Sequence, residues 1–127
     1  MAIKFKVIER GRPGEPESVK KFYANAQTSG ELTLAKLTKS IEMMSTVSGA
    51  DIRAVLYAMV DVMKMSLADG QIVRLGELGS LRISLSSNGE ETAEDVTSRS
   101  VKGARTVFLP GAELKNMLKN MTYEKVS

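Results

Sequence analysis

The 127-residue sequence contains no cysteine and no histidine. The chain therefore cannot form disulfide bonds, and it lacks the thiol nucleophile, the histidine and cysteine zinc ligands and the general base that many enzymes use. For this reason we expect no enzymatic activity, no cofactor, no metal site and no small-molecule substrate. The absence of cysteine also suits a reducing compartment, which predicts a cytoplasmic protein.

Long apolar runs and strong net charge are also absent. No stretch is long enough to cross a bilayer, and the first six residues alternate and carry charge, unlike a signal sequence, so we expect no membrane partner. The net charge is only +3, from 18 basic and 15 acidic residues, with six of the bases in residues 1–30. This balance permits a polyanionic partner without requiring one. A hydrophobic content of 43% is ordinary for a single folded domain.

The first 30 residues have the period of β-strands. Ile3, Phe5 and Val7 alternate with lysines, which predicts a half-buried strand, and residues 19–26 predict a second strand beside it. The glycine- and proline-rich residues 10–16 predict the loop between them. We interpret residues 1–30 as an N-terminal β extension.

Helical periodicity begins at residue 33. Apolar residues predict a first helix to about residue 46, and Ser48 and Asp51 have the spacing of a capping box that begins a second helix. Gly70 is suited to end this second helix in the left-handed conformation. The apolar face of the second helix is too wide for the first helix alone to cover: Ile52, Val55, Leu56, Met59, Val60, Met63 and Leu67.

Strand patterns return after Gly70. Residues 72–75 and 81–85 predict a hairpin, and residues 106–109 predict a third strand. Residues 86–95 contain four acids and no base, which predicts a solvated loop.

The last elements follow the Pro110-Gly111 step. Apolar residues between positions 114 and 121 predict a short terminal helix, and we interpret residues 122–127 as a C-terminal tail. The sequence thus predicts an α+β domain over residues 31–121.

The order of these elements from Leu34 to Leu118 resembles the bacterial HU and integration-host-factor family of histone-like DNA-binding proteins. The most specific local match is Phe108-x-Pro110-Gly111-x-x-Leu114-Lys115, and Leu78-Gly79-x-Leu81-x-Ile83 also matches. The segment Lys20-Lys21-Phe22-Tyr23-Ala24 is similar to a longer HU-like subgroup. The resemblance implies an HU-like fold and an intertwined homodimer, in which a second subunit covers the wide apolar helix face.

The resemblance also implies double-stranded DNA as a partner, contacted by a two-stranded arm. Relatives bend DNA by wedging a proline from the arm between base steps. This chain has no proline between Leu85 and Phe108 and its arm begins with acids, so we expect a short arm that bends DNA little. The candidate DNA-binding residues are Arg82, Arg99, Lys102, Arg105, Lys115, Arg10 and Arg12.

Two of these groups also have a simpler interpretation. Arg10-Gly11-Arg12-Pro13 contains the core of a minor-groove AT-hook, but so short a motif arises by chance, and we favour a solvated loop between strands. The cations near the arm would equally discourage edge-to-edge aggregation of exposed strands.

Two hypotheses for the function follow. The first is a nucleoid-associated homodimer that binds DNA with little sequence specificity through backbone phosphates. The alternative is an HU-fold dimer with weak or no DNA affinity that acts as a protein-interaction or structural module. The Pro110-Gly111 motif and a pI of about 9.2 favour the first, whereas the small net charge and the acidic arm favour the alternative.

Overall fold

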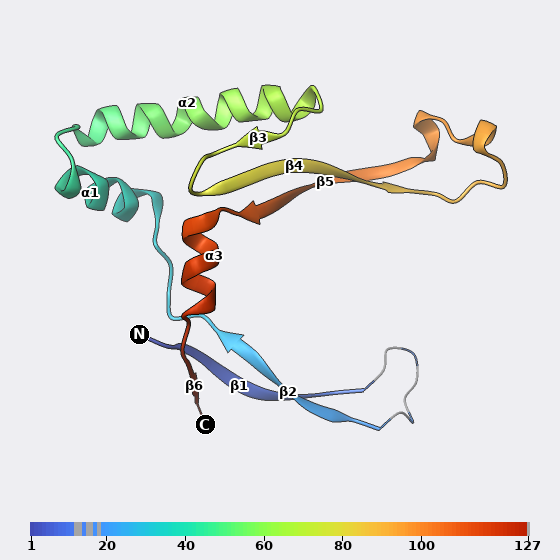
Figure 1. Ribbon diagram of the computed structural model, residues 1–127, viewed down its shortest axis with the longest axis horizontal. Helices are drawn as coiled ribbons and strands as arrows, with labels where there is room; N and C mark the ends of the chain where they lie inside the picture. Colours follow the sequence, from blue (N-terminus) through green and yellow to red (C-terminus); the bar gives the residue numbers. More distant parts are fainter. Residues whose placement is uncertain (12–13, 15–16, 18, 127) are drawn as a thin grey trace.

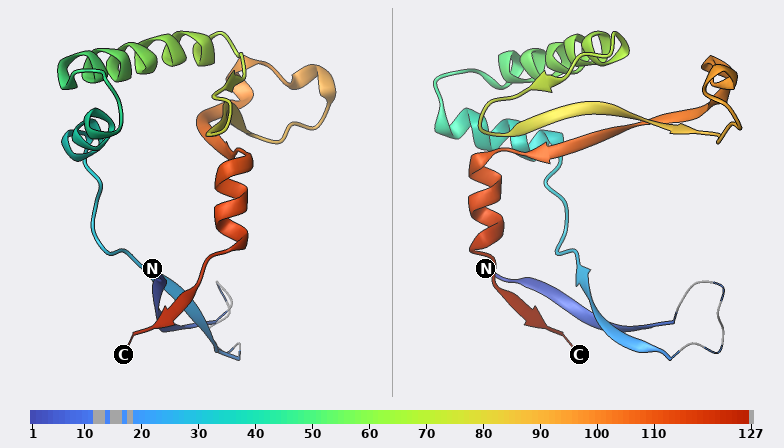
Figure 2. Two further views of the ribbon diagram at one scale, coloured as in Figure 1. Left: turned by 60° about the vertical axis from the view of Figure 1, so that its left-hand side comes forward. Right: turned by 45° about the vertical axis from the view of Figure 1, so that its right-hand side comes forward.

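The computed structural model describes residues 1–11, 14, 17 and 19–126, and this part of the chain has a mixed α+β architecture (Figure 1). Three α-helices and two three-stranded sheets form it. Figure 2 shows that helix α3 (Ala112–Lys119) lies between the two sheets, so the sheets occupy opposite ends of this helix.

Both ends of the chain contribute to the N-terminal sheet. Strand β1 (Ile3–Arg10) pairs antiparallel with β2 (Lys21–Gln27), as the alternation predicts. Arg10, predicted to lie in the loop, is the last residue of β1. Strand β6 (Tyr123–Lys125) runs parallel to β1 on its other side. Residues 122–127, predicted as a tail, therefore contain a strand. Pairing with β1 satisfies the backbone hydrogen-bonding groups of this segment, which is too short to show an alternating pattern of its own.

The first helix begins where helical periodicity begins in the sequence, and the second begins at the predicted cap. In α1 (Leu34–Met44) the Thr33 hydroxyl accepts a hydrogen bond from the Lys36 amide at 3.3 Å. In α2 (Gly49–Ala68) the Ser48 hydroxyl accepts from the Asp51 amide at 3.2 Å, which is one of the two bonds of a capping box. These caps satisfy amides that a helix cannot pair internally.

Helix α2 ends at Ala68, and Gly70 two residues later takes the predicted left-handed conformation, with a φ of 81°. The Gly70 amide donates to the Leu67 carbonyl and the Gln71 amide donates to the Ser66 carbonyl, both at 3.0 Å. This pair of bonds is the Schellman motif, which reverses the chain toward the next strand. In the described part of the chain, no helix combines the length and apolarity that crossing a membrane requires.

The second sheet contains β3 (Val73–Arg74), β4 (Gly79–Ser87) and β5 (Val101–Pro110), antiparallel and in that order. Strands β4 and β5 extend away from the helices as a two-stranded arm, here defined as residues 79–110 (Figure 1). The arm is longer than predicted, since β5 begins at Val101 rather than Thr106. Residues 101–105 show no clear alternation, and pairing with the long β4 makes them a strand.

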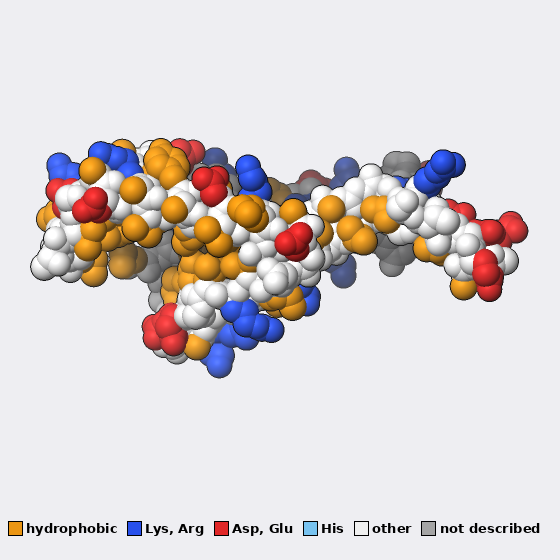
Figure 3. All heavy atoms as spheres, turned by 90° about the horizontal axis from the view of Figure 1, so that it is seen from above, with side chains coloured by type: hydrophobic (Ala, Val, Ile, Leu, Met, Phe, Trp, Pro, Cys, Tyr) orange, Lys and Arg blue, Asp and Glu red, His pale blue; other side chains and the backbone are white. Residues whose placement is uncertain are grey.

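The apolar residues of this chain are mostly uncovered. Among the described residues, Ile52 is the one buried hydrophobic side chain, while Leu56 and Leu67 on the same side of α2 are half-buried. Val55 and Val60 are 64% and 57% exposed, and hydrophobic side chains spread over α1 and α2 in Figure 3. The wide apolar face predicted for α2 is therefore present, and this chain covers its middle but not its two flanks.

Candidate nucleic-acid interface

The Pro110-Gly111 motif joins the base of the arm to the turn before β4. The Gly111 amide donates a hydrogen bond to the Leu78 carbonyl at 2.9 Å. A Cβ atom at position 111 would collide with the carbonyl oxygen of Glu77, so the two backbones approach as closely as only glycine allows. This contact fixes where α3 starts and in which direction the arm leaves the domain.

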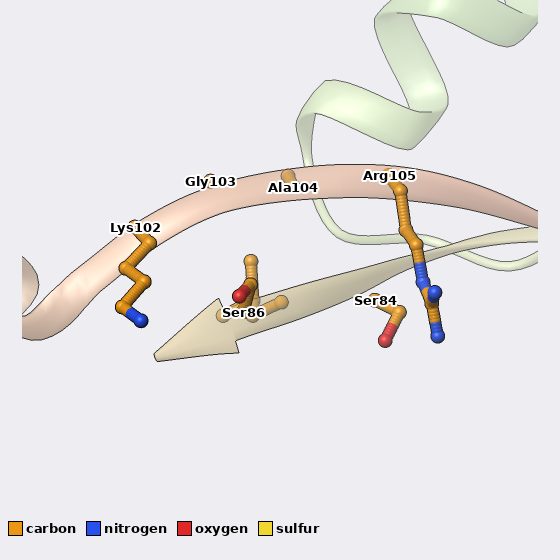
Figure 4. A pocket seen from close by; sticks show the side chains of 7 residues that line it. Ser84, Ser86, Lys102, Gly103, Ala104 and Arg105 are labelled. Atoms are coloured by element: carbon orange, nitrogen blue, oxygen red, sulfur yellow. The ribbon is translucent and has the colours of Figure 1, made fainter. Parts of the chain in front are cut away.

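One face of the arm carries cations and hydroxyl groups. The register pairs Arg82 with Val107 and Ser84 with Arg105, so Arg82 and Arg105 lie on the same face. Figure 4 shows that Lys102 and Arg105 project to the same side as Ser84 and Ser86, where a shallow concavity of about 440 Å³ lies between them. We call the following residues the cationic face of the arm: Arg82, Ser84, Ser86, Lys102 and Arg105.

A β-bulge places Lys102 on this face. Lys102 and Arg105 are three residues apart, so regular alternation would put them on opposite faces. In the structure, Ser86 pairs with Gly103 but Ser87 pairs with Val101, which leaves Lys102 as an extra residue in β5. Bulges re-aim side chains in this way. The three cations of the arm strands therefore gather on one surface.

The opposite face of the arm is apolar and lies against α2. Ile83 and Leu85 from β4 border a hollow of about 480 Å³ together with Leu67 at the end of α2 and Ile72 after it, and Arg82 borders the same hollow from the edge of the strand. Ile83 and Leu85 are still 37% and 64% exposed, so α2 covers this apolar side only in part. The cationic face lies on the other side of the strands and is open to a large partner.

Arg74 continues the cationic face into the third strand. It pairs with Ser80, which lies on the same side of β4 as Arg82, and its side chain is exposed. Arg74 was not among the site residues predicted from the sequence. The signal for it was its position between Val73 and Leu75, two apolar residues that direct the arginine between them to the other face of a short strand.

The tip of the arm is organised around Ser100, which is only 3% exposed. Its hydroxyl donates to the Glu90 carboxylate at 3.0 Å and accepts from the Thr97 amide at 3.2 Å. The Asn88 amide donates to the Ser100 carbonyl at 2.7 Å. Residues 86–95 are therefore not simply the solvated loop that the sequence predicted, because Ser86 and Ser87 belong to β4 and Glu90 holds the tip together.

The other acids of the tip face solvent. Glu91 and Glu94 are exposed, and acidic side chains gather at the end of the arm in Figure 3. Arg99 lies beside them in a single 3-10 turn, Ser98–Ser100. The tip of the arm is thus acidic, whereas the two strands that lead to it are basic.

The remaining predicted site residues lie apart from the cationic face. Lys115 is on α3, and Arg10 is in the N-terminal sheet. Arg12 falls outside the described residues. The structure therefore brings together Arg82, Lys102 and Arg105, and it separates them from Arg99, Lys115 and Arg10.

A family model described as "HU domain fused to wHTH, Ig, or Glycine-rich motif", HU-HIG, matches residues 1–125. The chain belongs to the HU-HIG family. The match confirms the HU resemblance inferred from the Pro110-Gly111 motif and the order of elements. It also includes the N-terminal sheet and β6, which lie outside the predicted HU-like domain of residues 31–121.

A solved structure described as a "putative bacterial DNA binding protein" from Bacteroides vulgatus is similar in fold, with a TM-score of 0.68 and 11% sequence identity. The similarity covers 98% of this chain but 48% of that chain, so this chain spans about half the length of that protein. No curated protein matches the sequence.

Proposed function

We propose that this HU-HIG protein binds double-stranded DNA with little sequence specificity, as a homodimer that organises chromosomal DNA in the bacterial nucleoid. The observation that carries the proposal is the cationic face of the arm, where Arg82, Lys102 and Arg105 share one open surface. Cations of this kind neutralise phosphates and hold a duplex without reading its sequence. Ser84 and Ser86 lie between them and supply hydroxyl donors for phosphate oxygens.

The uncovered apolar surface supports the dimer. The chain exposes 10914 Å², whereas a compact monomer of this mass would expose about 6,600 Å². Part of this excess comes from the projecting arm and the β1–β2 hairpin, and the rest leaves enough surface for each chain to contribute half of the area that obligate dimers bury, about 2,000–5,000 Å² in total. In the proposed dimer, the exposed apolar residues on both flanks of the Ile52 stripe of α2, Val55 on one flank and Val60 on the other, pack against the second subunit.

The proposed contacts have an order of importance. Arg82, Lys102 and Arg105 are the principal phosphate contacts, and Arg74 extends them at the base of the arm. Arg99 and Lys115 contribute less, because Arg99 is in the same tip as four acids and Lys115 is on a different element.

A protein-interaction module is the second candidate function. The acidic, exposed tip with Val96 at 56% exposure favours it, since carboxylates repel phosphates while an apolar side chain among them suits a protein surface.

A titration of a random-sequence duplex at several salt concentrations separates the two candidates. The DNA-binding proposal predicts that log affinity falls linearly with log salt concentration, with a slope of about 0.9 for every phosphate neutralised. It also predicts similar affinities for duplexes of unrelated sequence. Absence of binding at low salt would overturn the proposal in favour of the protein-interaction module.

A further inference from the structure

The N-terminal sheet has a second cationic surface, which includes one predicted site residue, Arg10, and three lysines that were not predicted. The β1–β2 register places the even-numbered residues of β1 on the same face as the odd-numbered residues of β2. Four exposed cations of these strands therefore share one face, which we call the N-terminal basic face: Lys4, Lys6, Arg10 and Lys21. Glu124 of β6, opposite Lys4, is the one acid on this face among the described strand residues.

Two of these cations lie directly opposite each other. Arg10 pairs with Lys21 at the end of the hairpin, and like charges at paired positions destabilise a sheet. An anion bound between them would remove this repulsion. Tyr23 and Asn25 lie on the same face and add exposed hydrogen-bond donors beside the cations.

The length of the face suits a polyanion rather than a small ion. Lys4 and Arg10 are six residues apart on one strand, which corresponds to about 20 Å. Each strand of duplex DNA presents a phosphate every 3.4 Å or so along the axis, so a ridge of this length can run beside several of them.

The N-terminal sheet lies on the side of the arm that carries its cations. In Figures 1 and 2, α2 is above the arm and the N-terminal sheet is below it, joined through α3. In Figure 4, Lys102 and Arg105 point away from α2. The arm and the β1–β2 hairpin also project in the same direction from α3 (Figure 1). A duplex on the cationic face of the arm is therefore on the same side as the N-terminal sheet.

We propose that the N-terminal basic face is a second DNA-contacting surface, which binds backbone phosphates of the duplex held by the arm. This inference rests on the proposed function and adds to it a contact outside the arm. It assigns a role to the N-terminal sheet, namely to lengthen the stretch of DNA that one subunit covers.

The test compares two double variants with equal loss of charge. In Lys6→Gln/Lys21→Gln, both changes lie on the N-terminal basic face. In Lys119→Gln/Lys125→Gln, one change is on α3 and the other is on the opposite face of the N-terminal sheet. Each is titrated with a long random-sequence duplex at several salt concentrations.

The proposal predicts that Lys6→Gln/Lys21→Gln lowers the salt slope by about 1.8 for each subunit while the control keeps the wild-type slope. It also predicts that Lys21→Glu weakens DNA binding but melts at or above the wild-type temperature, because glutamate opposite Arg10 replaces a repulsive pair by an attractive one.

The possible failures are distinguishable. Wild-type slope in Lys6→Gln/Lys21→Gln, together with a reduced slope in an arm variant, would overturn this inference and leave the proposed function intact. Lack of wild-type binding to any duplex would overturn both. Binding of the wild type to poly-glutamate but not to duplex DNA would also overturn it, since the face would then belong to an acidic protein partner.

Discussion

A Cβ atom on Gly79 would collide with the carbonyl oxygen of Leu109, the residue before the Pro110-Gly111 step. Gly79 also has a φ of 142°, a conformation that other residues rarely adopt. The turn before β4 and the end of β5 therefore approach each other at a position where only glycine fits without strain.

We expect Gly79→Ala to reduce the free energy of unfolding by about 2 kcal/mol or more, since both backbone strain and a steric clash oppose the new methyl group. Urea denaturation measures this change. Gly89→Ala is the matched control, because position 89 is in the arm tip with no heavy atom within 4 Å of the added Cβ. Its effect is expected to stay within about 0.5 kcal/mol. Equal effects of the two substitutions would contradict the close-approach account.

Dimerisation is tested by placing a charged side chain on the exposed apolar surface of α2. We expect Val55→Asp to prevent the dimer and leave a largely unfolded chain, because a buried carboxylate would have no partner in the interface. Light scattering and the dependence of the melting temperature on protein concentration measure this effect. Val96→Asp, at a comparably exposed valine in the arm tip, should leave both measurements unchanged. A wild-type monomer whose melting temperature does not change on dilution would refute the dimer.

The acids of the arm tip should oppose DNA binding. We expect Glu91→Gln/Glu94→Gln to raise affinity at low salt, with a smaller gain at high salt, because screening already weakens the repulsion there. Glu90→Ala should not give this gain, since it removes the side chain that accepts the hydrogen bond from Ser100 and so loosens the tip. Duplex titrations measure the affinities. Weaker binding by Glu91→Gln/Glu94→Gln would show that the tip contacts something other than phosphate.

Bending of the bound duplex should be slight. The segment between Leu85 and Phe108 contains no proline, and the exposed apolar residue at its tip is the small Val96. Wedging a base step open requires a side chain that replaces the lost stacking, which valine supplies poorly. Energy transfer between dyes at the two ends of a short duplex measures the bend. A large decrease in end-to-end distance on binding would contradict this expectation.

The fold could be predicted where local physical signals were strong. Ser48 and Gly70 carry the chemistry of helix ends, and both ends lie where this chemistry places them. The alternation of Ile3, Phe5 and Val7 likewise predicted the first strand correctly. Strands β6 and the first half of β5 were missed, because their conformation depends on a partner strand distant in sequence rather than on their own residues.

The candidate site could be predicted only in part for the same reason. Arg82 and Arg105 were found as cations near the arm, but their common face follows from the register of β4 and β5. Lys102 lies on the same face because of a β-bulge, which no pattern in the sequence predicted. The N-terminal basic face depends on which residues of β1 and β2 are paired, so its four cations look scattered in the sequence.

The most direct test of the central claim compares Arg82→Gln/Lys102→Gln/Arg105→Gln with Lys36→Gln/Lys39→Gln/Lys64→Gln, an equal loss of charge on the exposed surfaces of α1 and α2. The measurement is the salt dependence of affinity for a random-sequence duplex. If the cationic face of the arm holds the DNA, the arm variant loses about 2.7 from the salt slope for each subunit and most of its affinity, and the helix variant binds like the wild type. Wild-type affinity and slope in the arm variant would contradict the account.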